Sequence, residues 1–352
     1  MNERLLAVLN SAADFDGLLI TCEKERRYLT SFDSGDAGVL VITQDAATLI
    51  IDGRYFELAE KQASVTVLLQ ENLYEQIKAL LTDCKRVAVQ SGITLAQFEL
   101  MKTKLDGIEL APCEAVDKVL SEMARIKTEK ELNAIIRAQE IAELAFDHIL
   151  GFIKEGVTDI EIAAELEYVM RKNGAEAMSF DTIAVSGANS SVPHGVPTAK
   201  RVSAGDFVTM DFGAVVNGCH SDMTRTVAVG FATDEMKQVY STVLAAQTKA
   251  LSGIKAGVPC SQIDRLARDV ITAAGYGEYF THSTGHGVGY EIHEAPNLSL
   301  KSEQILKAGD VVTVEPGIYL PGRMGVRIED MAFVTENGCK NLTKTPKELI
   351  IV

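Results

Sequence analysis

Short apolar runs alternate with amphipathic stretches over the first 120 residues of the chain. The apolar runs have the length of strands and end at polar or glycine-containing turns. They predict strands at residues 16–21, 37–43, 47–52, 65–69, 86–90 and 108–111. Apolar residues recur at helical spacing between them, and helices are predicted at residues 4–12, 54–63, 73–82 and 95–105. This alternation indicates an α/β layer domain.

Longer helical patterns begin near residue 128. Thr128 and Glu131 have the spacing of a capping box, which predicts a helix that runs to about residue 154. Thr158 and Glu161 repeat that spacing before a second helix, which Gly174 is expected to end. Both helices belong to a part of the chain whose helical patterns are longer than those of the first 120 residues.

This change in the length of the helical patterns indicates a division of the chain into two parts. Its 352 residues are too many for one ordinary core, which favours two domains. We expect an α/β domain over residues 1–120 and a second domain over residues 121–352, with the boundary at residues 117–127. Charged clusters at residues 23–27 and 127–130 are predicted to lie in solvent.

The second domain repeats two phrases along its length. A Gly-Val pair followed by a helix and a glycine occurs at residues 156–174 and again 101 residues later. The phrase AGDFVTMDFG at residues 204–213 recurs as AGDVVTVEPG at residues 308–317, offset by 104. Unrelated segments would rarely share so much, so we predict a duplicated helix-and-sheet unit that folds into one pseudo-symmetric domain.

Acidic residues occupy matching places in the two copies. Asp211 and Glu315 lie on the first strand of each copy, while Asp222 and Glu329 open the second strand. The duplication therefore predicts that four carboxylates converge from two related hairpins.

A turn signal sets the spacing of the first pair. Asn217-Gly218 is typical of a two-residue hairpin turn, which places Thr224 opposite Asp211. Asp211 and Asp222 then become diagonal neighbours on one face, with backbones about 7–8 Å apart. Two ionised carboxylates that close repel each other unless a cation lies between them.

A glycine-rich segment with two histidines, residues 281–289, lies between the copies. Four carboxylates and one imidazole suit Mn²⁺, Co²⁺, Fe²⁺ or Zn²⁺ better than a thiolate site would. Two divalent ions would balance four carboxylates and activate a water, as in two-metal hydrolases. We therefore predict two divalent metal ions, with manganese favoured over cobalt, zinc and iron.

Composition limits the class of partner. Hydrophobic residues make up 47% of the chain and charged residues 24%, the balance of a globular protein. The net charge of −15 argues against nucleic acid, because phosphate binding needs a basic surface. The longest apolar runs are strand-length, so no membrane partner is expected. The N-terminus lacks a signal-peptide layout and the six cysteines form no CxxC pair, which predicts a cytoplasmic protein.

The order of the motifs DFG, SDMTRT, THSTGHGVG, EPGIY and RIED resembles the metallopeptidases of the pita-bread fold, which include methionine aminopeptidase, aminopeptidase P and prolidase. The phrases VPHG, HEAPN, EPGIYLPG and GVRIED resemble the Xaa-Pro branch, and RRYLTSF and DGRYFELA extend the resemblance into the first domain. The resemblance implies a creatinase-like α/β N-terminal domain for substrate gating and dimerisation. It also implies an α+β pita-bread catalytic domain with pseudo-twofold duplication.

The resemblance also implies roles for individual residues. The five metal ligands would be Asp211, Asp222, His286, Glu315 and Glu329. The residues around the substrate would be His194, His282, His293 and Arg327. His293 would stabilise the tetrahedral intermediate, and Glu315 would also act as the general base.

Three functions are compatible with this fold. The favoured one is hydrolysis of an Xaa-Pro bond at the N-terminus of a proline-containing peptide. A creatinase-like enzyme without metal would have lost ligands, and all five are present. A non-catalytic binding module is the third, and the intact ligands and accessory histidines argue against it.

The substrate length separates two forms of the favoured function. Prolidase cuts only Xaa-Pro dipeptides, whereas aminopeptidase P accepts longer peptides. Asn297 follows HEAP where some prolidases carry an arginine, which favours the aminopeptidase P type and leaves prolidase as the alternative.

The first domain carries a departure from the family pattern. Asp33 and Asp36 occur where related chains often read closer to FTGSAG. In the family such loops approach a neighbouring subunit's active site, which implies a homodimer. We hypothesise that Asp33 or Asp36 positions the free amino group of the substrate.

Overall fold

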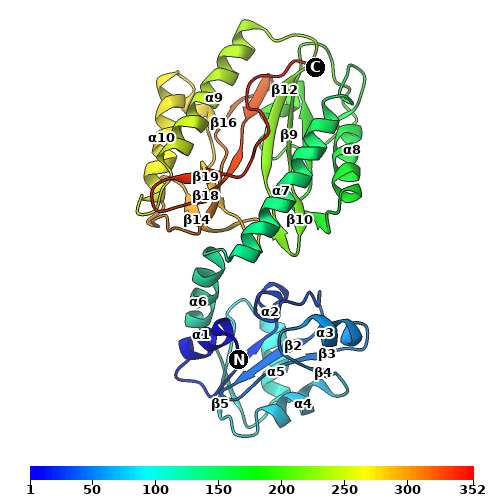
Figure 1. Ribbon diagram of the computed structural model, residues 1–352, viewed down its shortest axis with the longest axis vertical. Helices are drawn as coiled ribbons and strands as arrows, with labels where there is room; N and C mark the ends of the chain where they lie inside the picture. The colour runs from blue at the N-terminus through cyan, green and yellow to red at the C-terminus, as the bar shows by residue number, and fades with distance from the viewer. The chain divides into compact units, whose positions relative to one another are not determined.

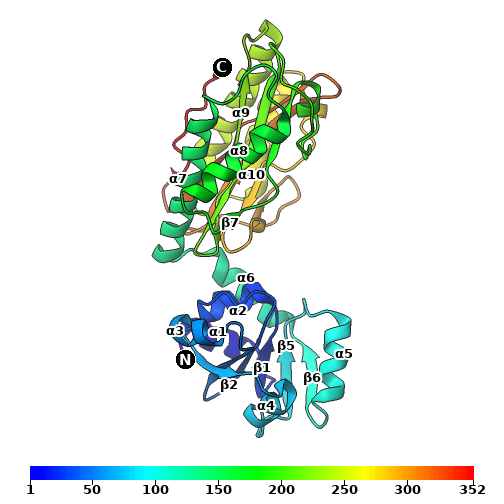
Figure 2. The same cartoon turned by 90° about the vertical axis from the view of Figure 1, so that its right-hand side faces the viewer.

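The computed structural model describes residues 1–352. The chain separates into two compact units, Met1–Ala124 and Arg125–Val352. The division falls at the end of helix α6 (Glu114–Arg125). The sequence patterns did not predict this helix. Both units are drawn in Figures 1 and 2.

The first unit is built on a six-stranded mixed sheet in the order β4-β3-β2-β1-β5-β6. Its strands are β1 (Gly17–Ile20), β2 (Val39–Thr43), β3 (Ala47–Ile51), β4 (Thr66–Leu69), β5 (Arg86–Val89) and β6 (Glu109–Pro112). Its helices before α6 are α1 (Glu3–Ser11), α2 (Glu23–Thr30), α3 (Phe56–Gln62), α4 (Leu73–Leu80) and α5 (Leu95–Lys104). The six predicted strands and four predicted helices are present, with ends displaced by at most two residues.

The prediction that the charged cluster at residues 23–27 lies in solvent is wrong for one residue of helix α2. Arg26 is only 2% exposed. The guanidinium of Arg26 donates to Ser34 Oγ at 3.1 Å and to the Gly35 carbonyl at 2.6 Å. The helix therefore buries a charged residue because the following loop turns back and supplies its acceptors.

The second unit contains four long helices: α7 (Glu129–Ile149), α8 (Asp159–Lys172), α9 (Asp234–Gly253) and α10 (Cys260–Ala273). Both predicted capping boxes are present, with Thr128 and Thr158 each accepting from the backbone of the glutamate three residues later. In Figure 1, α7 and α8 lie on one side of the strands, and α9 and α10 lie on the other. Each pair has its own apolar core against the sheets.

The strands of this unit form several small antiparallel sheets. The first copy of the duplication and the strands beside it comprise β7 (Ala177–Met178), β8 (Ile183–Ser186), β9 (Phe207–Phe212), β10 (Ala214–Val216), β11 (Cys219–His220) and β12 (Met223–Ala228). The second comprises β13 (Gly285–Gly287), β14 (Glu294–Leu298), β15 (Val311–Val314), β16 (Gly317–Leu320), β17 (Met324–Arg327), β18 (Asp330–Val334) and β19 (Cys339–Asn341). Two 3₁₀ turns, η1 (Gly187–Ser191) and η2 (Gly277–Tyr279), complete the unit.

The predicted hairpin of the first copy is confirmed. Asn217 and Gly218 both have positive φ, 49° and 73°, as a two-residue turn of this type requires. Thr224 lies opposite Asp211 in the register of β9 and β12. The turn just before β9 and the one just before β15 each contain a glycine with positive φ, Gly205 and Gly309, so the two copies share local geometry as well as sequence.

The segment before α7 holds two buried cations. Arg125 is 3% exposed, and its Nε lies 2.6 Å from Asp310 Oδ1. Lys127 was predicted to lie in solvent, which is wrong: its ammonium group donates to Glu294 and to the Arg125 carbonyl. Residues 128–130 are exposed as expected. These buried pairs attach the start of the second unit to β14 and to the turn before β15.

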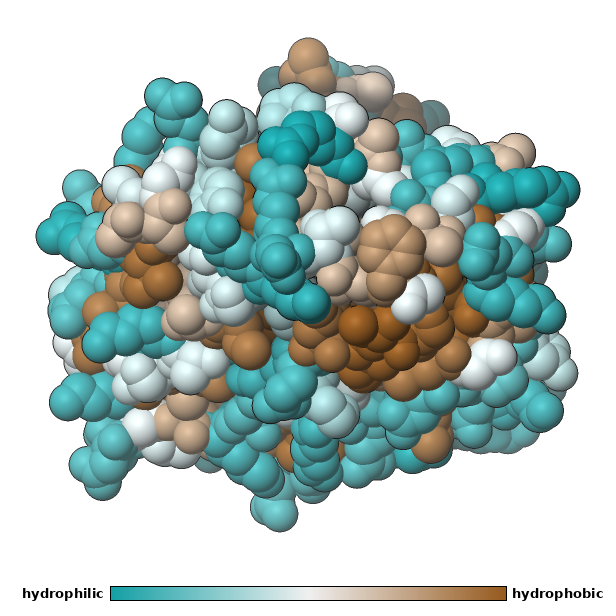
Figure 3. All heavy atoms as spheres, turned by 90° about the horizontal axis from the view of Figure 1, so that it is seen from above, coloured by the Kyte–Doolittle hydropathy of each residue, from teal (hydrophilic) through white to brown (hydrophobic).

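The surface mixes polar and apolar groups. Figure 3 shows one face on which apolar side chains gather into a patch bordered by hydrophilic ones. Large apolar side chains that are half or more exposed in the second unit include Ile160, Val192, Val196 and Phe231. None of the helices is both long and apolar enough to cross a lipid bilayer.

Candidate metal centre and catalytic pocket

Four carboxylates reach one place because their strands end there. Asp211 is on β9 and Asp222 directly precedes β12, while Glu315 follows β15 and Glu329 precedes β18. Asp222 and Glu329 are 4% and 1% exposed. Ligand atoms of Asp222, Glu329 and His286 all lie within 4.8 Å of one another, which is close enough to share a metal ion.

His286 projects toward these acids from β13. Its Nδ1 lies 3.1 Å from the Gly287 carbonyl oxygen, so Nδ1 carries the proton and Nε2 presents a lone pair. Nε2 lies 3.6 Å from Asp222 Oδ2 and 3.5 Å from Glu315 Oε1. The imidazole is therefore held as a neutral ligand would be.

Close packing explains why glycines flank His286. A Cβ on Gly285 would lie 2.0 Å from the Thr313 carbonyl oxygen, and one on Gly287 would lie 2.3 Å from the Ala295 carbonyl oxygen. Neither glycine has a positive φ. Close approach of the neighbouring backbone, and no special turn, requires glycine at these two positions.

The electrostatics fit a bound cation. Burial and then the neighbouring carboxylates raise the pKa values of Asp222 and Glu329 well above their usual range. Burial raises the pKa of Glu315 to about 8, and burial lowers the pKa of His286 to about 4. Asp211 Oδ1 is buried without a hydrogen-bond partner, so it has a lone pair free for a metal. The donor set therefore suits divalent cations.

Arg327 orients the acids from β17. Its Nη2 donates to Asp211 Oδ2 at 2.5 Å, and its Nε donates to Thr224 Oγ1 at 3.0 Å. The Thr224 hydroxyl in turn donates to Glu329 Oε2 at 2.7 Å. One guanidinium thus fixes one acid directly and a second through a threonine.

Tyr319 links Arg327 to His282. The hydroxyl of Tyr319 accepts from Arg327 Nη1 at 2.8 Å and lies 2.9 Å from His282 Nε2. His282 Nδ1 donates to the Ser283 carbonyl at 2.8 Å, so Nε2 accepts a hydrogen bond from the Tyr319 hydroxyl. Burial raises the pKa of Tyr319 to about 12 and lowers that of His282 to about 4, which keeps both groups neutral.

Tyr319 and Thr224 are not among the predicted site residues. A signal existed for Thr224, because the predicted register already placed it opposite Asp211. Tyr319 lies in the EPGIY phrase, four residues after Glu315. Its partner His282 is 37 residues away, and no local pattern pairs them.

All nine predicted site residues line one cavity of about 900 Å³. His194 and His293 are exposed on its wall, and the His293 ring centroid lies 4.3 Å from that of His286. Apolar side chains from several segments complete the lining, including Phe180, Ile183, Val196 and Ile292. A cavity with an apolar wall and convergent polar groups is typical of a small-ligand site.

Asp33 and Asp36 lie in the first unit. Asp33 Oδ2 accepts from Arg27 at 2.7 Å, and the side chain of Asp36 is 85% exposed. Their action on a substrate amino group stays a prediction.

Comparison with known proteins adds the family. Metallopeptidase family M24 matches residues 133–336, and the Creatinase/Prolidase N-terminal domain matches residues 3–123. The chain belongs to metallopeptidase family M24. This confirms the resemblance drawn from the motifs, the creatinase-like and pita-bread fold class, and the enzyme class, a hydrolase.

Individual relatives match along the whole chain. An Xaa-Pro dipeptidase of Pyrococcus horikoshii is 40% identical over 99% of both chains. The structure of an Xaa-Pro dipeptidase from Bacillus anthracis has a TM-score of 0.94 at 43% identity and covers 99% of both chains. An X-Pro aminopeptidase structure from Thermotoga maritima has a TM-score of 0.92 at 36% identity, covering 97% of this chain and 100% of its own.

Proposed function

We propose that this M24 metallopeptidase is an Xaa-Pro dipeptidase that uses two divalent metal ions. The observation that carries the proposal is the single cavity that gathers four carboxylates, His286 and the Arg327 network. The Xaa-Pro dipeptidases that match 99% of the chain support the substrate class.

The ions would be held by Asp211, Asp222, His286, Glu315 and Glu329. Bound there, they would supply Lewis acidity and a nucleophilic water at neutral pH. Manganese is the metal we propose, on the oxygen-rich ligand set.

Protein groups around this centre perform the remaining steps. Glu315 accepts a proton from the attacking water and returns it to the departing proline nitrogen. His293 donates a hydrogen bond to the carbonyl oxygen as negative charge develops there. His194 and His282 bind the substrate, and the hydrogen bond to Tyr319 orients His282. Arg327 keeps Asp211 and Glu329 in place.

The length of the substrate is the finer part of the proposal. Asn297 favoured the aminopeptidase P type on sequence, but relatives named as dipeptidases match this chain over its full length and support the alternative. Arg327 already pairs with Asp211, and His293 is assigned to the carbonyl oxygen, which leaves the exposed imidazole of His194 on the cavity wall. We propose that His194 binds the free carboxylate of the dipeptide.

The compartment and the oligomeric state of the enzyme are further parts of the proposal. The six cysteines form no CxxC pair, which supports a reducing compartment, and we propose the cytoplasm. A homodimer is proposed from the family resemblance of the loop that carries Asp33 and Asp36.

The test compares two substrates. Purified protein loaded with Mn²⁺ is incubated with an Xaa-Pro dipeptide and with an Xaa-Pro-Yaa tripeptide, beside a chelated control. Metal-dependent cleavage of the dipeptide alone supports the proposal. Cleavage of the tripeptide makes the enzyme an aminopeptidase P, and cleavage of neither refutes the Xaa-Pro assignment.

A further inference from the structure

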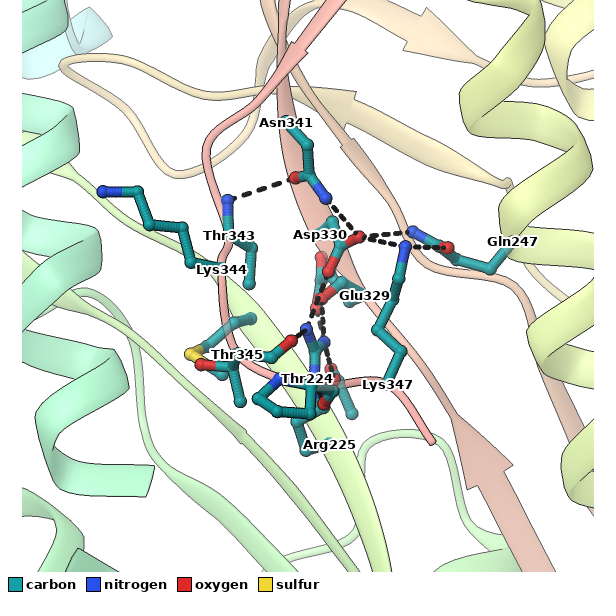
Figure 4. Close-up of polar contacts among 12 residues, drawn as sticks. Thr224, Arg225, Gln247, Glu329, Asp330, Asn341, Thr343, Lys344, Thr345 and Lys347 are labelled. Carbon is teal, nitrogen blue, oxygen red and sulfur yellow. Dashed lines mark hydrogen bonds and ion pairs between the residues drawn. The ribbon is translucent and has the colours of Figure 1, made fainter. Parts of the chain in front are cut away.

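A buried polar cluster surrounds the residue that follows the proposed metal ligand Glu329 (Figure 4). Its centre is Asp330, which follows Glu329 in sequence and is fully buried. The carboxylate of Asp330 accepts four hydrogen bonds, from Arg225 Nη2 at 2.8 Å, Gln247 Nε2 at 3.0 Å, Asn341 Nδ2 at 2.9 Å and Lys347 Nζ at 2.8 Å. A buried carboxylate satisfied this fully is held in one position.

Arg225 connects Asp330 to the ligand next to it. The guanidinium is 1% exposed and donates from Nη1 to the Glu329 carbonyl at 2.5 Å and to the Thr224 carbonyl at 2.9 Å. The Glu329 amide itself donates to the Thr224 carbonyl at 3.1 Å. Both polar groups of the Glu329 backbone are therefore tied to β12, at the point where the two copies of the duplication meet.

The C-terminal segment completes the cluster. The carbonyls of Thr345 and Pro346 accept from Arg225 at 2.8 Å and 3.0 Å. Lys347 Nζ donates to Asp330 and also to Gln247 Oε1 at 2.9 Å, which turns the amide NH₂ of Gln247 toward the same carboxylate. A segment more than a hundred residues from Arg225 in sequence thus supplies its acceptors and the second cation.

We propose that Lys347 is a positioning residue of the metal centre. It acts through an unbroken series of hydrogen bonds: Lys347 holds Asp330, Asp330 holds Arg225, and Arg225 holds the backbone of Glu329. The inference rests on the proposed function only for the role of Glu329 as a metal ligand. It makes the C-terminal segment part of the active site, although none of its residues lines the cavity.

The test measures metal binding directly. Lys347→Met removes the charge and the donors while keeping most of the side-chain length. We expect the affinity for Mn²⁺, measured by calorimetry, to fall about tenfold, as for other groups that orient metal ligands. We also expect the visible absorption of the Co²⁺-loaded protein to shift, because it reports the geometry of the ligands.

Two further variants make the result specific. Lys344→Met is the matched control, since Lys344 is exposed and its ammonium group takes no part in the network of Figure 4. We expect it to bind Mn²⁺ and Co²⁺ as the wild type does. Lys347→Arg keeps a cation next to Asp330, and we expect it to restore most of the affinity and the wild-type spectrum.

The outcome that overturns the proposal is a Lys347→Met protein with unchanged Mn²⁺ affinity and Co²⁺ spectrum, even if its melting temperature is lower. If that variant does not fold, Asp330→Asn weakens the same series of bonds with little change of shape, and the same two readouts apply. Metal binding is measured without substrate, so failure of the wild type to cleave Xaa-Pro dipeptides would refute the proposed function and leave this test intact.

Discussion

The two copies of the duplicated unit bring matching acids to the metal centre through different hairpins. In the first copy, β10 and β11 are joined by the tight Asn217-Gly218 turn. In the second, β16 and β17 are joined by a longer turn in which Gly322 has a φ of 68°. The longer hairpin carries Tyr319 and Arg327, and the first has no counterpart of either.

The difference between the two hairpins shows which features the copies share and which arose after the duplication. Duplication supplies symmetric carboxylates, which alone would repel each other. Divergence makes the pair Asp211 and Glu315 unequal: Asp211 is tied to Arg327 at 2.5 Å, whereas Glu315 faces His286 at 3.5 Å. One acid is thereby held by a fixed cation, whereas the other faces an imidazole.

Removing an acid of the first copy tests whether both copies are needed. We expect Asp222→Ala to lower turnover at least ~100-fold, because it removes a proposed ligand, and groups that only orient ligands already contribute 10–100-fold. Bound Mn²⁺ per chain should fall in the same variant. Asp269→Ala, on the exposed face of α10, is the control. A metal-loaded, active Asp222→Ala enzyme would overturn the ligand assignment.

Arg327 exists in the second copy alone, and its replacement asks how much divergence contributes. Lysine keeps the charge but cannot reach Asp211, Tyr319 and Thr224 at once, as the guanidinium does. We expect Arg327→Lys to lower kcat by roughly 10–100-fold. Steady-state kinetics measure it against Arg323→Lys, an exposed residue paired with Glu235 on the surface. Equal kcat values for the two variants would contradict the orienting role.

The acids of both copies predict how the metal-free protein responds to pH. The pKa of Glu315 is raised to about 8, and those of Asp222 and Glu329 are also raised, so the folded state holds protons that the unfolded state has lost. This contribution to stability is complete below about pH 4.5 and is lost as the pH rises toward 8. The lowered pKa values of His286 and His282 act in the opposite direction, but only below about pH 6.5.

Between pH 6.5 and 8 the carboxylates act alone. We expect the metal-free protein to lose stability on the order of 1 kcal/mol per pH unit as Glu315 gives up its proton. The melting temperature should fall across this range without metal and stay level with Mn²⁺ bound. A metal-free protein whose melting temperature rises from pH 6.5 to 8 would show that the acids are not buried together.

The smallest expected effect concerns the longer turn itself. A Cβ on Gly322 meets no atom within 4 Å, so Gly322→Ala costs only the strain of its left-handed backbone, about 1 kcal/mol. Gly338→Ala is the matched control, since that glycine is equally open and has no positive φ. Chemical denaturation compares the two, and activity should be unchanged in both. Equal stability of the two variants would mean that the turn tolerates a side chain.

Local signals in the sequence determined much of this protein. The helix starts at Thr128 and Thr158, the turn at Asn217-Gly218 and the pairing of Asp211 with Thr224 all follow from residues close together in the chain. The duplication extended that reach, because matching phrases placed acids at matching positions. The family followed from the order of the motifs.

Tertiary structure alone decided the partners of the buried charges. Arg26 and Lys127 are of residue types that usually lie on the surface. In the folded protein, however, a backbone carbonyl accepts a hydrogen bond from Arg26, and a carboxylate pairs with Lys127. The contacts of Arg225 with Thr345 and of Arg327 with Asp211 span more than a hundred residues. A cap or a turn is encoded by groups a few residues apart, whereas a buried charge is stable only where folding brings distant acceptors to it. No pattern along the chain specifies that meeting.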